Sequence, residues 1–192
     1  NITLKSEDYA KAEILGIQCN KLNEYVESGI LLCANCRHWY PIMYGLPVLH
    51  PYKTLITYEF IKKHKSFVNR FSDKYATPKG TPKPGEQFVL RSFSKEWKEY
   101  EYDGVIWGWS YKDREKTFLT EMGFAPGEVF GVKFLEIGCG IGITTSFAQD
   151  NYKGDAVGVD LSLAVLKATS YFRGNPFLHF IQASLFQLPL KK

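Results

Sequence analysis

The chain has 192 residues, of which 45% are hydrophobic and 23% are charged, and this is the usage of an ordinary globular protein. The composition excludes a disordered, a collagen-like and an acidic-tail protein. Uncharged apolar stretches stay well below about 18 residues, and charges interrupt the first seventeen positions, so we expect no membrane span, no signal peptide and a cytoplasmic protein.

Charge is distributed unevenly along the chain. The net charge is +4, but residues 51–100 carry 11 Lys and Arg against 5 Asp and Glu, whereas residues 101–150 carry 4 against 8. A basic excess in mid-chain is typical of a solvated face or linker and also of a surface that binds an anionic partner, so nucleic-acid binding stays open.

Residues 1–52 are predicted to form a small β-rich domain. Short strands are expected over 28–50, where an apolar run is followed by a cysteine-rich turn and then by two apolar segments around Gly45. The cysteines are too few for a disulfide-stapled secreted domain, and reduced thiols or metal ligands fit better. They are Cys19, Cys33, Cys36 and Cys139.

Residues 53–87 connect this domain to the rest of the chain. Helical spacing of apolar residues predicts one amphipathic helix from Thr54 to Phe71. Five Pro and Gly residues then fall within positions 73–87, with no apolar periodicity, which predicts an exposed linker.

The third part, residues 88–192, changes character along its length. It opens with eight aromatic residues over 88–111, and helical segments are expected as far as Gly123. Beyond them, strands and helices are predicted to alternate. The strands are expected over 132–137, 155–160 and 177–182, and the helices over 142–151 and 162–172. Ser162 is the expected N-cap of the second helix. This alternation defines an α/β fold, and the strands are the first three of a doubly wound parallel sheet.

A glycine-rich turn follows the first of these strands, with the sequence Glu136-Ile137-Gly138-Cys139-Gly140-Ile141-Gly142. Glycines lack a Cβ atom, so a ligand can approach the backbone amides, and the helix beyond favours a negatively charged group. Asp160 lies 22 residues after Gly138, at a strand end where a carboxylate can accept hydrogen bonds from ribose hydroxyls. A dinucleotide fingerprint requires glycine at position 143, but that residue is Ile143. A nicotinamide oxidoreductase is therefore only the third choice of function, behind the two that are given at the end of this section.

The turn, with residues 157–162 and 182–189, resembles the S-adenosylmethionine (SAM) site of class I methyltransferases, which have a Rossmann-like fold. The resemblance implies SAM as cofactor, with Glu136, Gly138 and Gly140 along its methionyl end and Asp160 at its ribose. Ser184 stands where the family commonly has Asp, so adenine recognition would rest on backbone and apolar contacts around it. The complete set of cofactor-binding residues that the resemblance implies is Glu136, Gly138, Cys139, Gly140, Gly142, Asp160, Leu161, Ala183, Ser184 and Leu185. Within this set we expect Cys139 to be a small packing residue.

The aromatic stretch also resembles part of that family. Residues 91–97, Trp107 and residues 114–118 are similar to the segment ahead of the glycine turn in one bacterial subgroup. Aromatic rings there would close over the sulfonium, since a cation near a ring face gains about 0.5 to 2 kcal/mol. Core packing is the other interpretation of these rings.

Residues 14–50 resemble the second half of a small zinc-ribbon domain, which is fused to such enzymes and also occurs as a separate methyltransferase activator. A structural zinc takes four ligands, normally as two cysteine pairs. Cys33 and Cys36 supply one pair, but position 16 is Gly16, so only Cys19 remains of the other. Either His38 or a water completes the site, or the ribbon is degenerate and metal-free and is held together by the packing of Leu31, Trp39, Tyr40, Ile42 and Leu46.

These resemblances imply a SAM-dependent methyltransferase with an unidentified methyl acceptor, and a small molecule is slightly favoured over RNA. No catalytic base can be assigned. The alternative function is a non-catalytic binding or scaffold module with a relic methyltransferase fold. Acceptor-facing groups in the family usually come from strands beyond the third, so we expect the second half of the sheet in a continuation of this chain or in another chain.

Overall fold

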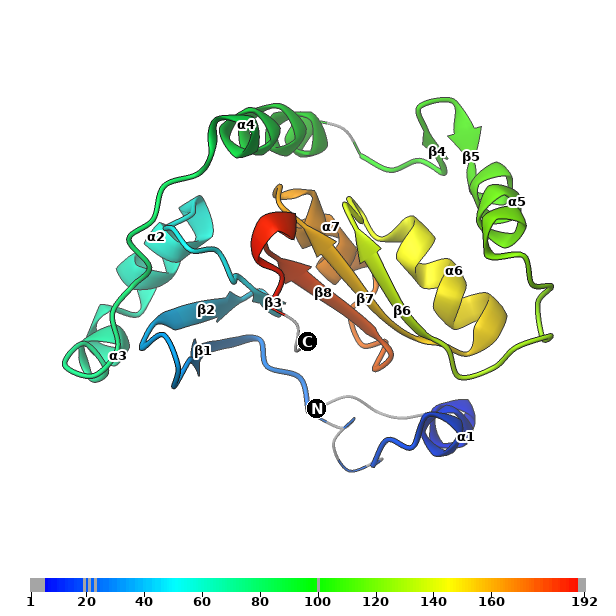
Figure 1. The fold of residues 1–192 in the computed structure, drawn as a ribbon, viewed down its shortest axis with the longest axis horizontal. Coiled ribbons are helices and arrows are strands. Elements are labelled where there is room, and N and C mark those ends of the chain that lie inside the picture. Colours follow the sequence, from blue (N-terminus) through cyan, green and yellow to red (C-terminus); the bar gives the residue numbers. More distant parts are fainter. Residues whose placement is uncertain (1–5, 19, 21, 23, 100, 190–192) are drawn as a thin grey trace.

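The computed structural model describes residues 6–18, 20, 22, 24–99 and 101–189 (Figure 1). Within these ranges the chain forms an antiparallel three-stranded sheet, a two-stranded hairpin and a parallel three-stranded sheet, in that order. The mixed α/β class that the sequence predicted is therefore present, with the parallel sheet in the C-terminal part.

The N-terminal segment consists of helix α1 (Ser6–Leu15) and the antiparallel sheet. Its strands are β1 (Ser28–Leu32), β2 (Trp39–Met43) and β3 (Leu46–Pro47), in the spatial order β1-β2-β3. Tyr44 and Gly45, both with positive φ, form the turn between β2 and β3, which is the usual geometry of a two-residue hairpin. The short strands predicted over 28–50 are confirmed.

The single helix predicted from Thr54 to Phe71 is wrong, because the chain forms two helices there. Helix α2 (Leu55–Lys63) begins with a capping box between Thr54 and Thr57. Helix α3 (Lys65–Asn69) starts anew after His64, whose φ of −123° and ψ of 32° lie outside the helical range. The apolar spacing continues through the break, so periodicity alone did not reveal it.

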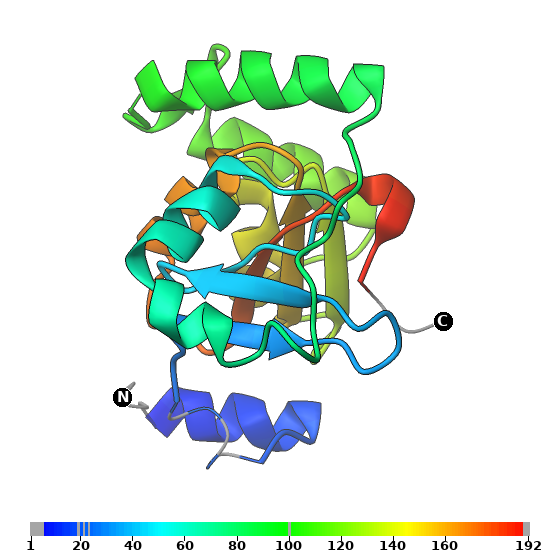
Figure 2. The ribbon, with the colours of Figure 1, turned by 90° about the vertical axis from the view of Figure 1, so that its left-hand side faces the viewer.

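The linker predicted over 73–87 is wrong at its end, because helix α4 (Pro84–Glu99) begins inside it. Proline is well tolerated at the first position of a helix, where its missing N–H has no intrahelical partner. Glu86 supports this start by accepting a hydrogen bond from the Lys83 amide at 2.8 Å. Figure 2 shows α4 lying across one end of the molecule, at the top of the view.

A short hairpin and a helix lead from α4 to the parallel sheet. The hairpin consists of β4 (Val105–Ile106) and β5 (Trp109–Ser110), and helix α5 (Tyr111–Met122) follows directly. Ser110 caps α5 through a capping box with Asp113, and Gly123 ends it in the left-handed conformation. The helical end that the sequence placed at Gly123 is confirmed.

The C-terminal part alternates strands and helices as predicted. It contains β6 (Lys133–Ile137), α6 (Ile143–Tyr152), β7 (Asp155–Asp160), α7 (Ala164–Tyr171), β8 (Leu178–Gln182) and a 3₁₀ helix (Leu185–Gln187). The strands pair in parallel in the order β6-β7-β8. The start of α7 differs slightly from the prediction, since Leu163 is its N-cap, although the Ser162 hydroxyl accepts a hydrogen bond from the Ala164 amide.

The N-terminal sheet joins the outer edge of β8. The amide of Leu49 donates to the carbonyl of Gln182 at 2.8 Å, and Val48 forms a parallel bridge with the same residue. Figure 1 shows β3 beside β8 at this edge. One hydrophobic core runs across the junction, with Trp39, Leu46 and Phe60 on one side and Phe147 and Phe180 on the other.

No helix of the described segments is both long and apolar enough to cross a membrane.

Candidate functional site

The glycine turn lies at the carboxyl end of β6, beside the end of β7. The amides of Gly138 and Cys139 both donate to the carbonyl of Val159, which joins the turn to β7. Gly138, Gly140 and Gly142 have φ values of +80°, +54° and +80°, a region that side chains other than glycine rarely adopt. The turn therefore requires glycine at these positions.

The three glycines have different surroundings. A Cβ atom added at Gly138 or Gly140 would meet no atom within 4 Å, whereas one at Gly142 would lie 2.6 Å from the Phe180 ring and 3.0 Å from Ala168. Gly138 and Gly140 thus leave room for a ligand to approach the backbone. Gly142 instead allows the start of α6 to pack against β8 and α7.

Asp160, at the end of β7, holds the turn in place. One carboxylate oxygen, Oδ2, accepts a hydrogen bond from the Gly140 amide at 2.9 Å. The other, Oδ1, accepts from both the amide and the hydroxyl of Ser162 at 2.7 Å. A carboxylate offers about four lone-pair positions, so Asp160 retains acceptor capacity for a further donor.

Glu136, the last but one residue of β6, is the second carboxyl group of the site. Its Oε2 atom accepts a hydrogen bond from the Thr145 hydroxyl at 2.5 Å. Burial raises the pKa of Glu136 to about 7, against the opposing effects of the Thr145 hydrogen bond and the positive charge of Arg114. Glu136 therefore changes its charge near neutral pH.

Cys139 is buried within the turn, with 7% of its surface exposed. Burial raises the pKa of its thiol, and the charges of Asp160 and Glu136 add to this effect. A thiol that stays protonated is a poor nucleophile, which agrees with the expected packing role.

A cavity of about 100 Å³ connects several of the predicted residues. It is bordered by Glu136, Gly138, Cys139, Gly140 and Asp160, and on the opposite side by Phe93 and Trp97 of α4 and Ile106 and Trp107 of the hairpin. Arg114 of α5 also lines it. No pattern in the sequence indicated that Ile106 would line this cavity or that the charge of Arg114 would lie close to Glu136.

The remaining predicted residues lie elsewhere. Gly142, Leu161, Ala183, Ser184 and Leu185 do not border this cavity. The Ser184 hydroxyl accepts from the Phe186 amide at 3.2 Å, as the N-cap of the 3₁₀ helix. Leu185 is exposed, and the carbonyl of Leu161 accepts a hydrogen bond from the Gln182 side chain at 3.1 Å.

The cysteine turn brings two of the predicted metal ligands together. The Cys36 amide donates to the Cys33 sulfur at 3.5 Å, and the Cys36 sulfur lies 3.6 Å from the Tyr40 hydroxyl. In the ranges that the structure describes, no three His, Cys, Asp or Glu side chains form a group that could hold a metal ion. Cys19 lies outside the described residues.

The packing expected for a metal-free ribbon is present except at one position. Trp39, Ile42 and Leu46 are buried and Tyr40 is partly buried. Leu31 is 39% exposed, so its predicted packing role is wrong. The next residue, Leu32, is 42% exposed as well, so both leucines at this end of β1 lie open to solvent.

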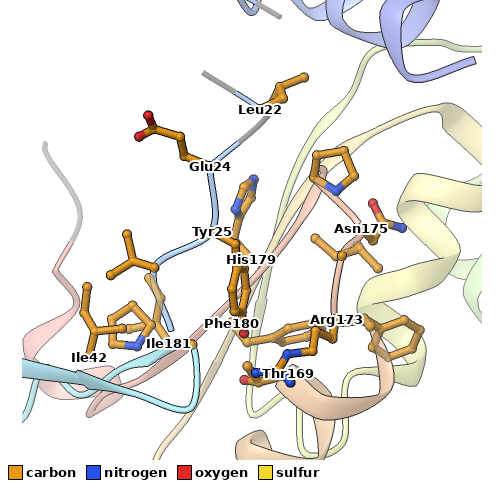
Figure 3. Close-up of a pocket in the computed structure, with 17 residues that line it drawn as sticks. Leu22, Glu24, Tyr25, Ile42, Thr169, Arg173, Asn175, His179, Phe180 and Ile181 are labelled. Carbon is orange, nitrogen blue, oxygen red and sulfur yellow. The ribbon is translucent and has the colours of Figure 1, made fainter. Parts of the chain in front are cut away.

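A larger cavity lies at the outer edge of β8, away from the glycine turn (Figure 3). It measures about 310 Å³ and is lined by Leu22, by residues 24–26, by the β2–β3 hairpin and by the α7–β8 region. Arg173 at its border already pairs with Glu27 and faces the Tyr25 ring at 5.5 Å. None of the predicted cofactor residues lines it.

Comparison with known proteins supports a methyltransferase domain. Residues 135–192 match the family described as "Methyltransferase domain", while comparison with curated proteins gives no match. For residues 135–192, the family match supports the methyltransferase class predicted from the sequence. It begins within β6, so the predicted zinc ribbon lies outside it.

Solved structures that resemble the chain include two methyltransferases. One is phosphoethanolamine N-methyltransferase 2 of Haemonchus contortus in complex with SAM, at 22% identity and a TM-score of 0.41, covering 56% of this chain and 26% of that one. The other is geranyl diphosphate C-methyltransferase of Streptomyces coelicolor A3(2), in complex with Mg²⁺, geranyl-S-thiolodiphosphate and S-adenosylhomocysteine (SAH). It has 13% identity and a TM-score of 0.42, and the match covers 59% of this chain and 53% of that one. Another solved structure that resembles the chain is that of the MccD protein, at 18% identity and a TM-score of 0.33, covering 42% of this chain and 35% of that one. The chain thus spans between about a quarter and a half of the length of these proteins.

Proposed function

We propose that this chain binds SAM at the glycine turn and takes part in methyl transfer. One arrangement carries the proposal: Glu136 and Asp160 flank a turn in which Gly138 and Gly140 face open space. Two glycines with open space beside their Cα atoms, flanked by two carboxyl groups, suit a ligand that has a positively charged methionyl end and a ribose. The family match to residues 135–192 supports the same ligand.

The protein groups have separate tasks in this proposal. Bound SAM supplies a methyl group already activated on a sulfonium, so the protein has to bind, orient and exclude water rather than create a nucleophile. Ionised Glu136 attracts the positive methionyl end, and Asp160 accepts from ribose hydroxyls while it holds Gly140. Phe93, Trp97 and Trp107 shield this side from water.

Entry of the cofactor requires the site to widen. The cavity at the turn measures about 100 Å³, whereas ligand pockets typically measure about 300 to 1,000 Å³. Helix α4 and the β4–β5 hairpin form its outer wall, and α4 is held to the start of α7 by a hydrogen bond from the Leu163 amide to the Ser94 hydroxyl at 3.0 Å. We expect SAH to change hydrogen exchange in α4 and the hairpin.

Calorimetry with SAM, SAH and NAD tests the proposal directly. SAM and SAH are expected to bind, and NAD is not, because Ile143 occupies the third glycine position of the dinucleotide fingerprint. Binding of NAD alone would contradict the proposal. Failure of all three to bind would favour the alternative function, a non-catalytic scaffold module, which the small volume of the cavity also favours.

For the methyl acceptor we propose only a chemical class. We favour a small molecule over RNA, although the basic excess of residues 51–100 leaves RNA as the second candidate. Incubation with SAM carrying a labelled methyl group, followed by separation of RNA from small molecules, distinguishes the two. Label in the RNA fraction would reverse the preference.

For the N-terminal segment we propose a degenerate, metal-free zinc ribbon. The support is that only Cys33 and Cys36 are brought together among the described residues, while Trp39 and Leu46 supply an apolar core. The amount of zinc per purified chain, measured by elemental analysis, tests this assignment.

A further inference from the structure

Two thiols lie close together in the loop that joins β1 to β2. The Cys36 amide donates a hydrogen bond to the Cys33 sulfur at 3.5 Å, and the Cys36 side chain is a further hydrogen-bond partner of the same thiol. Because an N–Cα bond measures about 1.46 Å, the Cys33 sulfur lies within about 5 Å of the Cys36 Cα atom. The two cysteines are therefore near neighbours at their side chains as well as in the sequence.

Backbone hydrogen bonds anchor this loop on two sides. The Cys33 amide donates to the His38 carbonyl at 2.9 Å, and the Arg37 amide donates to the Cys33 carbonyl at 3.0 Å. The Ala76 amide donates to the Arg37 carbonyl at 2.9 Å, and the Trp39 amide donates to the Ala76 carbonyl at 3.0 Å. The loop is thus tied to itself and to a segment beyond α3, which keeps the two thiols together before any reaction.

Both thiols are open to a small reagent. Cys36 is exposed and Cys33 is partly exposed, whereas Cys139 is buried in the glycine turn. The Cys36 sulfur lies 3.6 Å from the Tyr40 hydroxyl, a weak hydrogen bond that a rotation of the Cys36 side chain can exchange. A disulfide requires Cα atoms about 4.4 to 6.8 Å apart, and a tight turn over four residues brings its first and last Cα atoms within about 7 Å. A bond between the two sulfurs is therefore compatible with the loop as it stands.

The same pair is too small a ligand set for a structural metal. Such a zinc site takes four ligands, and the part of the chain that the structure describes holds no group of three His, Cys, Asp or Glu side chains around these two thiols or elsewhere. Two adjacent thiols without a metal are able to undergo thiol–disulfide exchange. The anchored loop favours the internal disulfide, because the second thiol is presented to the first at a high effective concentration.

We infer that Cys33 and Cys36 form a reversible dithiol–disulfide couple, which a small disulfide of the glutathione type oxidises and its thiol form reduces. The loop between β1 and β2 is then a site of oxidative modification. This inference rests on the metal-free ribbon proposed above, and it is independent of SAM binding and methyl transfer.

The reaction proceeds in two exchange steps. One cysteine sulfur attacks oxidised glutathione, so that the glutathione S–S bond breaks, a mixed disulfide forms and one reduced glutathione leaves. The other cysteine sulfur attacks the protein sulfur of the mixed disulfide, which forms the bond between Cys33 and Cys36 and releases the second glutathione. The protons of the two cysteine thiols end on the two glutathione molecules, and two electrons pass from the protein to oxidised glutathione.

Equilibration of the full chain in glutathione buffers tests the inference. Samples at different ratios of oxidised to reduced glutathione are quenched with acid, blocked with N-ethylmaleimide and mapped by peptide mass spectrometry. We expect a disulfide between Cys33 and Cys36 that dithiothreitol reverses, while Cys139 stays reduced. Because two glutathione thiols are released, the ratio of disulfide to dithiol should fall with the square of the reduced glutathione concentration. A stable mixed disulfide that follows the first power, or a disulfide that pairs either residue with Cys19, would overturn the inference.

Single variants assign the chemistry to the pair. Cys33→Ser and Cys36→Ser each remove the thiol that resolves the mixed disulfide, so both should accumulate glutathione on the remaining cysteine and form no internal disulfide. Cys19→Ser is the matched control, because it removes a cysteine of the same N-terminal segment and should keep the wild-type titration. If Cys36→Ser accumulates no more mixed disulfide than wild type, the two thiols do not act as a couple and the inference is wrong.

Zinc measured on the same preparation separates this inference from the metal-free ribbon on which it rests. Less than one zinc per chain, with thiols that stay reduced or end as mixed disulfides, would leave the metal-free ribbon in place and refute the couple. Stoichiometric zinc, with a disulfide that forms only after a chelator removes the metal, would refute both. Little zinc and a disulfide that forms without a chelator is the result expected from both.

Discussion

The carboxylate of Asp160 accepts a hydrogen bond from the Gly140 amide at 2.9 Å, so the acid at the end of β7 is tied directly to the turn that follows β6. The two residues lie 20 positions apart, and the parallel pairing of β6 with β7 brings them together. The same carboxylate therefore shapes the turn before any ligand arrives. A ligand that also bonds to Asp160 finds this group already oriented, which lowers the ordering cost of binding.

Replacing Asp160 by Ala should weaken both the fold and cofactor binding. The change leaves the amides of Gly140 and Ser162 without their acceptor and removes a charged acceptor from the ribose, so we expect a loss of about 1 to 3 kcal/mol in SAH binding. Calorimetry measures the affinity and urea unfolding measures the stability. Asp155→Ala is the matched control at the opposite end of the same strand, where it bonds to His179. Unchanged SAH affinity in Asp160→Ala would refute the ribose assignment.

Gly138 and Gly142 form a matched pair that separates ligand access from packing. Both have a φ of +80°, so an Ala side chain causes similar backbone strain at each, about 1 to 2 kcal/mol. Gly142→Ala adds a clash with Phe180 and should lose roughly 1 to 3 kcal/mol more stability. Gly138→Ala has no such clash and should chiefly weaken SAH binding. Urea unfolding measures the stability of both variants and calorimetry measures their SAH affinity. Unchanged SAH affinity in Gly138→Ala would show that Gly138 has no ligand-facing role.

The alternating strands and helices of the C-terminal part could be predicted from the sequence, because short, mainly apolar runs alternate with segments of helical spacing. The strand predicted over 155–160 agrees with β7 at both ends. The Asp160 hydrogen bond to Gly140 could not be predicted, since it depends on how a turn and a strand end meet in space. The same limit applies to the Ser184 hydroxyl, which is used by a local cap.

Other features escaped prediction for identifiable reasons. Pro84 reads as a breaker in sequence but occupies the first turn of α4, where proline is tolerated. The pairing of Val48 with Gln182 joins residues 134 positions apart, and no local pattern encodes such a contact. Tyr52 belongs to no sequence motif, and the lack of a hydrogen-bond partner for its buried hydroxyl among the described residues can be recognised only in the folded chain.

The cysteine turn is expected to hold less than one zinc ion per purified chain. Only Cys33, Cys36 and Cys19 match ligand positions in the sequence, and the described residues offer no group of three. Elemental analysis by mass spectrometry measures the metal. Stoichiometric zinc that is lost on Cys33→Ser or His38→Ala would show that a complete site forms.

The Cys33 thiol is expected to react faster than Cys139 with iodoacetamide near neutral pH. Hydrogen bonds from Cys36, first through its backbone amide and then through its side chain, lower the pKa of Cys33, whereas burial raises that of Cys139. The thiolate is the reactive form. Cys36→Ala removes the side-chain bond and should slow the alkylation of Cys33, as peptide mass spectrometry can follow. Faster alkylation of Cys139 than of Cys33 would contradict the burial of the glycine turn.

Glu136 should make the stability of the fold depend on pH between about 4.5 and 7. Burial raises the pKa of Glu136 from 4.5 to about 7 in the folded chain, so the folded state holds a proton that the unfolded state has already released. Stability should therefore fall as pH rises through this interval, by at most about 3 kcal/mol. Glu136→Gln keeps an acceptor for Thr145 but removes the charge, so urea unfolding should show it more stable than wild type at pH 8 and nearly equal at pH 4.

Cofactor binding should show the opposite pH dependence at the same residue. Ionised Glu136 attracts the positive charge of SAM and of the SAH ammonium group, so affinity should rise as pH increases through about 7 and level off above it. Glu136→Gln should bind more weakly at pH 8 and lose this rise. Glu121→Gln, an exposed carboxyl of α5, should keep the wild-type profile. Calorimetry with SAH from pH 6 to 8.5 checks the three profiles, and a rise that survives in Glu136→Gln would assign the pH dependence to a different group.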